Sequence, residues 1–257
     1  MKLDTIIRTK LLGQPYRPSQ RRFENDKIAG LRCASIVVDY VLEILPVKSV
    51  IDIGCGPALW LKTFADRGAS RIVGIDGDYT DRTRLAIDPT CFIGRDLNQR
   101  LTDLNLGKFD LAMSLEVGEH LLPERAESLV DDLCALSDFV MYGAAIEKQG
   151  GDQHINEHWQ SWWVAKFRSR DYLPYDVLRP AIWDRSEIAS WYKQNTIFYV
   201  RCGSSAHDIF AKRFPSPPTV MFDLVHPDLF LSHRNTKTGL RRLRKNVKRI
   251  FRPITGR

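Results

Sequence analysis

The sequence lacks the features typical of membrane-spanning, disulfide-bonded or zinc-binding proteins. Its apolar stretches, such as residues 36–45, are interrupted by charged side chains well before the roughly 18 residues that a membrane span needs. Its five cysteines are odd in number and widely spaced, and they include no C-x-x-C pair. Residues 1–22 are polar and basic, without the apolar region of a secretory signal. We therefore expect reduced thiols and a cytoplasmic protein.

Composition excludes a mainly disordered chain. Hydrophobic residues make up 44% of the 257 positions, and six Trp, eight Tyr and twelve Phe provide material for a packed core. A chain of this length can form one α/β domain of about 200 residues with an appendage.

Positive charge is concentrated at the C-terminal end. Residues 234–257 contain ten Lys or Arg and no acid, so this segment has a charge of +10. Because the whole chain has a net charge of +7, residues 1–233 have a net charge of −3. Any attraction to an anionic partner is therefore expected to come from the tail rather than from the body.

Apolar spacing predicts an alternation of helices and strands. A helix is expected over residues 24–45, where the spacing stops before Pro46. Five strand-like runs follow, with helices over 59–67 and 124–136 between them, and this order is typical of a parallel sheet with both faces covered. The expected strands are 49–53, 71–75, 91–94, 109–114 and 139–142. Helices over 159–168 and 185–193, and an antiparallel edge formed by strands 172–178 and 196–201, complete the domain.

The pattern divides the chain into four segments. We expect a polar leader at 1–23, an α/β domain with a mainly parallel sheet at 24–202, an irregular extension at 203–233 and a basic tail at 234–257.

A glycine-rich turn follows the first predicted strand, in the segment V-I-D-I-G-C-G-P-A at residues 50–58. Gly54 and Gly56 allow the backbone to approach a ligand closely at the carboxyl edge of the sheet. Asp52 at the end of the strand would repel a dinucleotide's diphosphate, and Leu59 occupies the position where such sites usually have a third glycine. A carboxylate instead suits S-adenosylmethionine, whose methionine end carries an ammonium group beside a cationic sulfur.

Two more acidic residues end the next strands. Asp76 is placed to accept hydrogen bonds from a ribose diol, or else to cap a helix. Asp96, with Leu97 beside it, is placed to accept a hydrogen bond from an adenine amino group.

These segments, in this order, resemble the motifs of class I S-adenosylmethionine-dependent methyltransferases over residues 25–202. The resemblance implies a Rossmann-like fold and places the fourth motif on K-F-D-L-A-M-S at residues 108–114. The cofactor contacts expected on this basis are Asp52, Gly54, Gly56, Asp76, Asp96, Leu97, Ser114 and Glu116.

The loop after the fourth strand carries a further group of polar residues. If this segment is helical, the spacing puts Glu116, Glu119 and His120 on one face. Three interpretations are open: a site for Mg²⁺ or Mn²⁺, an acid–base pair acting on a substrate hydroxyl, or hydrogen-bonding anchors of the loop.

A second histidine strengthens the metal interpretation. His154 lies in the polar loop G-G-D-Q-H-I-N-E-H-W at residues 150–159, which follows the fifth strand. E-x-x-E-H with a distant histidine is similar to the pattern of small-RNA 3′-end ribose methyltransferases, which implies the metal ligands Glu116, Glu119, His120 and His154. This chain lacks the distinctive sequence that follows the last histidine in that family.

A closer overall resemblance is to small bacterial methyltransferases that share G-G-x-x-H-x-N and a later W-Y-x-Q-N, here residues 150–156 and 191–195. That resemblance implies work on surface glycans or glycolipids. Gln153, Asn156 and Trp159 are then expected to contact a sugar, although aromatic residues in this region can equally fill the core.

The expected reaction is O-methylation of a sugar hydroxyl, with His120 or His154 as base and with Glu116 and Glu119 orienting them or binding a cation. Two alternatives are a metal-assisted methyltransferase acting on RNA ribose and a non-catalytic cofactor-binding partner of a glycan assembly.

The tail has apolar residues on one side of a potential helix and basic residues around them. This pattern favours an anionic membrane surface, while nucleic acid or no partner remain alternatives.

Overall fold

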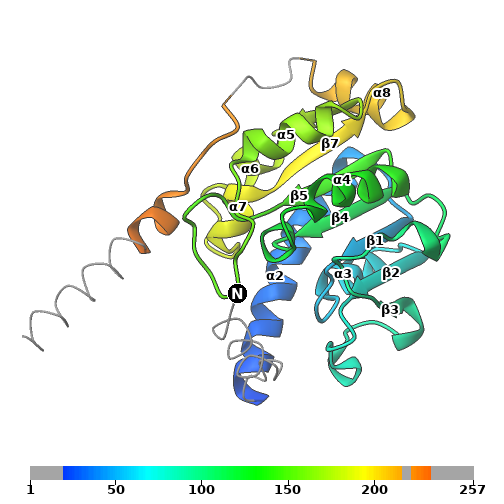
Figure 1. Ribbon diagram of the computed structural model, residues 1–257, viewed down its shortest axis with the longest axis vertical. Helices are drawn as coiled ribbons and strands as arrows, with labels where there is room; N and C mark the ends of the chain where they lie inside the picture. Colours follow the sequence, from blue (N-terminus) through cyan, green and yellow to red (C-terminus); the bar gives the residue numbers. More distant parts are fainter. Residues whose placement is uncertain (1–19, 216–220, 233–257) are drawn as a thin grey trace, which may run out of the picture.

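A computed structural model of the chain describes residues 20–215 and 221–232. The predicted basic tail and most of the predicted leader lie outside the described residues. The described chain forms one sheet covered by helices on both faces (Figure 1).

The sheet has seven strands in the order β3-β2-β1-β4-β5-β7-β6. β1 to β5 are parallel, whereas β7 pairs antiparallel with both β5 and β6. The strands are β1 (Ser49–Ile53), β2 (Arg71–Asp76), β3 (Phe92–Gly94), β4 (Leu111–Leu115), β5 (Phe139–Gly143), β6 (Tyr172–Tyr175) and β7 (Ile197–Arg201). The predicted Rossmann-like sheet with an antiparallel edge is therefore confirmed.

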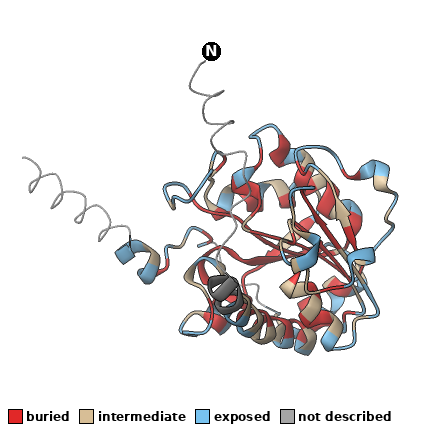
Figure 2. Cartoon of the chain, turned by 90° about the horizontal axis from the view of Figure 1, so that it is seen from below, coloured by how far each residue is buried: buried red, intermediate tan, exposed pale blue. Residues whose placement is uncertain are grey.

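Two buried clusters join the helices to the sheet. One face packs on α2 (Gln20–Ile44), α3 (Leu59–Asp66), α6 (Leu178–Ile182) and α8 (Ser205–Arg213). The other packs on α4 (Arg125–Leu136) and α5 (Gln160–Arg168). In Figure 2 the sheet is seen almost entirely buried between these two layers.

Three predictions near the C-terminal edge were wrong. Residues 203–233 were expected to be irregular, but α8 forms there and buries Phe210 completely, so the packed fold continues beyond residue 202. The helix predicted over 185–193 is the shorter α7 (Ser190–Asn195). The strand predicted over 172–178 ends at Tyr175, and α6 follows it, with the Arg179 guanidinium paired with Asp176 just before the helix.

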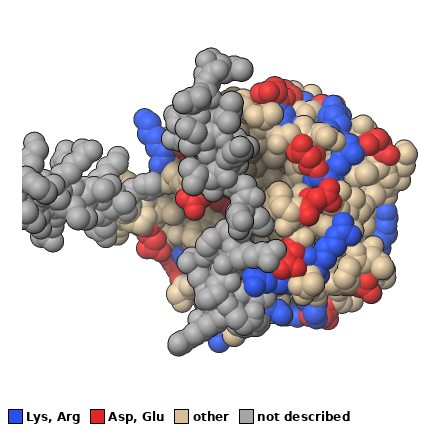
Figure 3. All heavy atoms as spheres, turned by 60° about the horizontal axis from the view of Figure 1, so that its bottom comes forward, with Lys and Arg blue, Asp and Glu red and all other residues tan. Residues whose placement is uncertain are grey.

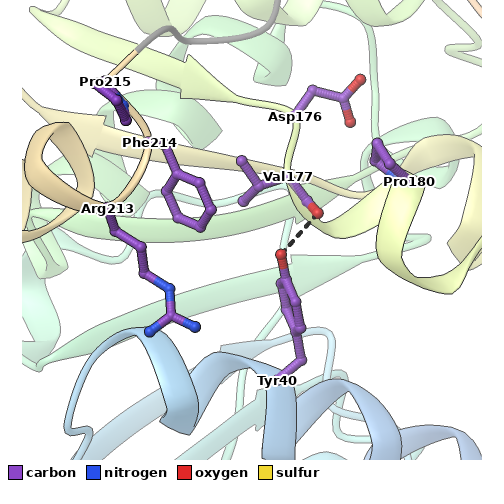
Figure 4. Close-up of a pocket in the computed structure, with 7 residues that line it drawn as sticks. All are labelled: Tyr40, Asp176, Val177, Pro180, Arg213, Phe214 and Pro215. Carbon is purple, nitrogen blue, oxygen red and sulfur yellow. Dashed lines mark hydrogen bonds between the residues drawn. The ribbon is translucent and has the colours of Figure 1, made fainter.

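The face of the described chain seen in Figure 3 carries interspersed acidic and basic side chains. A groove of about 440 Å³ lies between α2, α6 and α8, where Tyr40 donates a hydrogen bond to the Val177 carbonyl (Figure 4). None of the residues predicted for the functional site lines this groove. Within the described residues, no helix has the length and apolar character required to cross a membrane.

Candidate functional site

The glycine turn between β1 and α3 forms an open cradle at the carboxyl edge of the sheet. Gly54 has φ +84° and Gly56 has φ +50°, both in the left-handed region that favours glycine. A Cβ on Gly56 would meet no atom within 4 Å, whereas one on Gly54 would lie 2.2 Å from Val117 Cγ2. Gly56 therefore faces open space, and Gly54 is covered by the loop that follows β4.

Asp76 closes the cradle from the end of β2. Its Oδ2 accepts a hydrogen bond from the Gly56 amide at 2.7 Å, and its Oδ1 accepts from the Gly77 amide at 2.6 Å. Tyr79 donates its hydroxyl to the same Oδ1 at 3.0 Å, with a side chain that is 72% exposed. A carboxylate oriented in this way beside an open turn suits a ribose diol.

The other predicted cofactor residues differ in their environments. Asp52 is only 3% exposed, and burial, followed by the charge of Asp76, raises the pKa of its carboxyl to about 8. Asp96 is exposed and accepts hydrogen bonds from the backbone and side chain of Asn98. Leu97 and Ser114 are buried, and the Ser114 hydroxyl has no hydrogen-bond partner in the part of the chain that the structure describes.

The loop after β4 is not the helix that would put Glu116, Glu119 and His120 on one face. Glu116 has φ +57°, and only a short 3₁₀ turn, η4 (Gly118–His120), follows it. A Cβ on Gly118 would lie 2.2 Å from the Tyr142 hydroxyl, so the chain approaches β5 and α5 too closely at this position for any other residue. Glu116, predicted as a metal ligand with these residues, is therefore not part of the cluster that Glu119 and His120 form with His154 among the described residues.

Glu119, His120 and His154 come together beyond the sheet edge. One ligand atom from each can be chosen so that all lie within 4.8 Å of one another. Glu119 is fully buried, and among the described residues its carboxylate has no well-formed hydrogen bond, only weaker approaches of the Glu119 and Ala145 backbone, which act to lower its pKa. Burial, followed by the charge of Glu116, raises the pKa of Glu119 to about 9. Burial and the neighbouring His154 lower the pKa of His120.

His154 is oriented by a carboxylate that sequence reasoning did not identify. Its Nδ1 donates to Glu157 Oε1 at 2.8 Å, and Glu157 itself accepts from the Lys148 and Gly150 amides. This contact leaves Nε2 of the imidazole for a ligand. A Cβ on Gly151 would lie 2.2 Å from that nitrogen, so glycine keeps the position accessible.

The residues predicted to contact the acceptor occupy three different environments. Gln153 is exposed, with φ +63°, and Trp159 is partly buried at the start of α5. Asn156 is 3% exposed, and both ends of its side-chain amide have partners. Its Nδ2 donates to the Gly118 carbonyl, and its Oδ1 pairs with His158 Nε2. Asn156 thus anchors the His154 loop to η4.

Glu116 is bound by residues that the sequence did not single out as site residues. Asn195 Nδ2 donates to Glu116 Oε1 at 2.8 Å, and Gln149 Nε2 lies 3.5 Å from Oε2. These partners lie 79 and 33 positions away in the chain, so no local pattern could have identified them.

Comparison with known proteins agrees with this architecture. No model of a known protein family matches the chain. The structure of magnesium protoporphyrin IX methyltransferase from Synechocystis PCC 6803 with bound S-adenosylmethionine matches with a TM-score of 0.51 and 16% identity, over 77% of this chain and 92% of that one. Streptomyces venezuelae DesVI matches with a TM-score of 0.51 and 14% identity, over 73% of this chain and 100% of that one.

The chain has the fold of the class I S-adenosylmethionine-dependent methyltransferases. An O-methyltransferase family protein from Burkholderia thailandensis has the same fold, with a TM-score of 0.51 and 13% identity, over 73% of this chain and 61% of that one.

One curated sequence is also similar. Ribosomal RNA large subunit methyltransferase E of Myxococcus xanthus is 29% identical over 120 residues, which are 40% of this chain. The chain spans about half of that relative, 53% of its length.

Proposed function

We propose that this chain is an S-adenosylmethionine-dependent O-methyltransferase that acts on a hydroxyl of a sugar-containing acceptor. The observation that supports this proposal is a shared location. The glycine turn and Asp76 follow β1 and β2, while Glu119 and His154 follow β4 and β5, so all belong to the carboxyl edge of one parallel sheet.

The residues of the turn fit the proposed cofactor. Gly56 leaves open space where a ligand can approach the backbone, and Asp76 has an oriented carboxylate that can accept from ribose hydroxyls. When bound, the cofactor supplies a methyl group on a cationic sulfur. The role of the chain is to hold the acceptor oxygen in line with that group and to remove its proton.

Glu119, His120 and His154 also fit a divalent cation such as Mg²⁺ or Mn²⁺. The carboxylate of Glu119 is fully buried without a well-formed hydrogen bond among the described residues, which is costly unless a proton or a cation compensates it. The Glu157–His154 contact is the kind of outer-shell support that ligating histidines usually have. The cation would lower the pKa of the acceptor hydroxyl, whereas without it a histidine would act as the base.

The preference for a sugar rests on the resemblance to bacterial glycan-associated methyltransferases, on the exposed Gln153 next to His154 in the chain and on the partly buried Trp159 before α5. RNA ribose is the second candidate, because the similar Myxococcus protein is a ribosomal RNA methyltransferase and because the tail is basic.

Methyl transfer from labelled S-adenosylmethionine, tested on panels of nucleotide sugars, glycolipids and ribosomal RNA, would identify the acceptor. We expect His154→Ala to lower turnover by about 10²–10⁴-fold, the usual contribution of a positioned base or metal ligand, with cofactor affinity almost unchanged. His207→Ala, in α8 outside the cluster, is the matched control.

Chelation distinguishes the two versions of the mechanism. If a cation is used, EDTA reproduces the loss and Mg²⁺ or Mn²⁺ restores activity, and Mn²⁺ titrated into the protein binds the wild type but not His154→Ala. If EDTA leaves the activity unchanged, a histidine rather than a cation activates the acceptor hydroxyl. Full activity of His154→Ala on the identified acceptor would contradict both versions.

A further inference from the structure

The W-Y-x-Q-N segment at the end of α7 has no role in the mechanism above. Its last two residues are almost completely buried: Gln194 is 0% exposed and Asn195 is 3% exposed. A Cβ on Gly143, at the end of β5, would lie 3.2 Å from the Asn195 backbone, so α7 ends directly against the sheet edge. Two polar side chains are therefore delivered into the interior beside the site.

These side chains form a network of neutral amides around one carboxylate. Asn195 Nδ2 donates to Glu116 Oε1 at 2.8 Å and also lies 3.1 Å from Gln149 Oε1. Gln194 Nε2 donates to Gln149 Oε1 at 2.8 Å and to Asn195 Oδ1 at 3.0 Å. Each Glu116 oxygen thus has one amide donor and retains capacity to accept another hydrogen bond.

No cation compensates Glu116 within the described chain. Every partner of its carboxylate is a neutral amide, and none of the ion pairs of the described residues includes it. Burial raises the pKa of the Glu116 carboxyl to about 7, so a positively charged donor beside this amide-bound group would stabilise its ionised form.

Glu116 stands beside the cofactor turn. The next residue, Val117, covers Gly54, because a Cβ on that glycine would lie 2.2 Å from Val117 Cγ2. On the other side, Tyr192 of α7 contacts Trp60 at the start of α3, with ring centroids 5.3 Å apart. Asn195, the last residue of α7, bonds the Glu116 carboxylate directly. Glu116 therefore lies between the glycine turn and α7.

We propose that Glu116, oriented by Asn195 and Gln149, receives the α-ammonium group of the methionine part of S-adenosylmethionine. Asn195 and Gln149 are then positioning residues, and α7 becomes part of the cofactor site. An ammonium group offers three donors and a positive charge, which match the unused acceptor capacity of this carboxylate. The inference rests on the proposed cofactor, but it does not depend on which acceptor is methylated.

The alternative acid, Asp52, is less suited to this role. It lies inside β1, paired with Gly74 on one side and Met113 on the other, and its carboxyl is 3% exposed. Its buried position in the middle of the sheet gives a bulky ammonium group little access.

Calorimetry with two ligands tests the assignment. S-adenosylhomocysteine carries the amino-acid end, whereas 5′-methylthioadenosine keeps the adenine, ribose and sulfur but lacks that end. We expect Glu116→Gln to weaken S-adenosylhomocysteine binding by roughly 10- to 100-fold, the loss of one charged hydrogen bond, and to change 5′-methylthioadenosine binding less than about twofold.

The positioning residues are tested in the same way. Asn195→Leu, which has no donor, should weaken S-adenosylhomocysteine binding by about 3- to 10-fold without affecting 5′-methylthioadenosine. If the Asn195 variant does not fold, Gln149→Met replaces it, because that variant also removes an amide donor to Glu116. Thermal unfolding of each variant is measured beside the wild type.

The outcomes separate this inference from the proposed cofactor. If the wild type binds neither ligand, the cofactor proposal fails and this inference fails with it. If the wild type binds both but Glu116→Gln weakens both equally, Glu116 is structural and only this inference is overturned. If Asp52→Asn selectively weakens S-adenosylhomocysteine binding and Glu116→Gln does not, the ammonium group binds Asp52 instead and this inference is overturned.

Discussion

Two aspartates of the cofactor edge show how environment decides what a carboxyl group can do. Asp76 accepts two backbone amides and one hydroxyl, so its charge is stabilised and its oxygens are oriented toward the turn. Asp52 is only 3% exposed and receives no hydrogen bond from the described residues, so burial favours its neutral form. Sequence motifs could predict both positions, but they could not predict this difference in hydrogen bonding.

The first prediction concerns Asp76. Asp76→Ala should weaken S-adenosylmethionine binding by roughly 1.5–3 kcal/mol, because it removes a charge-assisted contact to the ribose. Isothermal titration calorimetry measures this loss. Tyr79→Phe is the matched control, since it removes only the hydroxyl that bonds Asp76 and leaves the carboxylate in place. Unchanged affinity in Asp76→Ala would exclude Asp76 from the cofactor site.

The second prediction concerns the pH dependence of stability that Asp52 causes. Its folded-state pKa is raised to about 8, whereas an unfolded aspartate titrates near pH 3.9, so unfolding releases a proton between these values. The free energy of unfolding should therefore fall as pH rises through this window, by up to about 1.4 kcal/mol per pH unit. Asp52→Asn removes the effect, and its stability relative to wild type should increase from pH 5 to pH 8.

Urea unfolding at both pH values measures this difference, with the exposed acid variant Asp78→Asn as the control. A difference between Asp52→Asn and wild type that stays constant with pH would show that Asp52 is ionised in the folded protein.

At the scale of elements, the sheet was predictable because parallel strands are short apolar runs with clear boundaries. β1 was predicted at its observed bounds, and the other four parallel strands were predicted to within two residues at each end. The conformation of the loop after β4 was not predictable. The spacing of Glu116, Glu119 and His120 is compatible with a helix, but tertiary contacts that the sequence does not reveal hold the loop in another conformation. Gly118 approaches Tyr142 of β5, and the backbone amides of Ile155 and Asn156 bond to the Glu119 carbonyl.

The candidate site was predictable to the same degree. The residues proposed to carry the chemistry came from motifs at strand ends, which sequence order brings to one edge. The residues that orient them, Glu157, Gln149 and Asn195, depend on tertiary contacts. Of these, only Glu157 is a sequence neighbour of the group it orients, three residues after His154.

The third prediction compares the two glycines of the turn. Gly56→Ala should cost only about 1 kcal/mol of stability, the usual penalty for alanine in the left-handed region, but should weaken cofactor binding because its methyl group projects into the open cradle. Gly54→Ala should lower the stability by a larger amount, because the new methyl group would clash with Val117 in addition to the backbone strain of the left-handed conformation. Thermal unfolding and calorimetry of both variants measure the contrast, and equal stability losses would contradict it.

At the scale of the whole molecule, charge and apolar surface are distributed unequally. Acidic and basic side chains are mixed on the face of the body seen in Figure 3, whereas the last 24 residues carry +10. Just before this tail, the segment 221–232 exposes four large apolar side chains. These are Met221, Val225, Phe230 and Leu231. Exposed apolar residues next to a cluster of basic residues favour the surface of an anionic membrane.

The last prediction tests that surface by truncation. Deleting residues 234–257 should leave thermal stability and cofactor affinity almost unchanged, because the buried clusters and the candidate site lie within the preceding chain. The same deletion should abolish sedimentation with liposomes that contain phosphatidylglycerol, since each basic residue near such a surface contributes about 1 kcal/mol. Neutral phosphatidylcholine liposomes are the control for both proteins. Equal sedimentation of the truncated and full chains would contradict the membrane interpretation, and salt-sensitive binding of RNA by the full chain alone would instead assign the tail to nucleic acid.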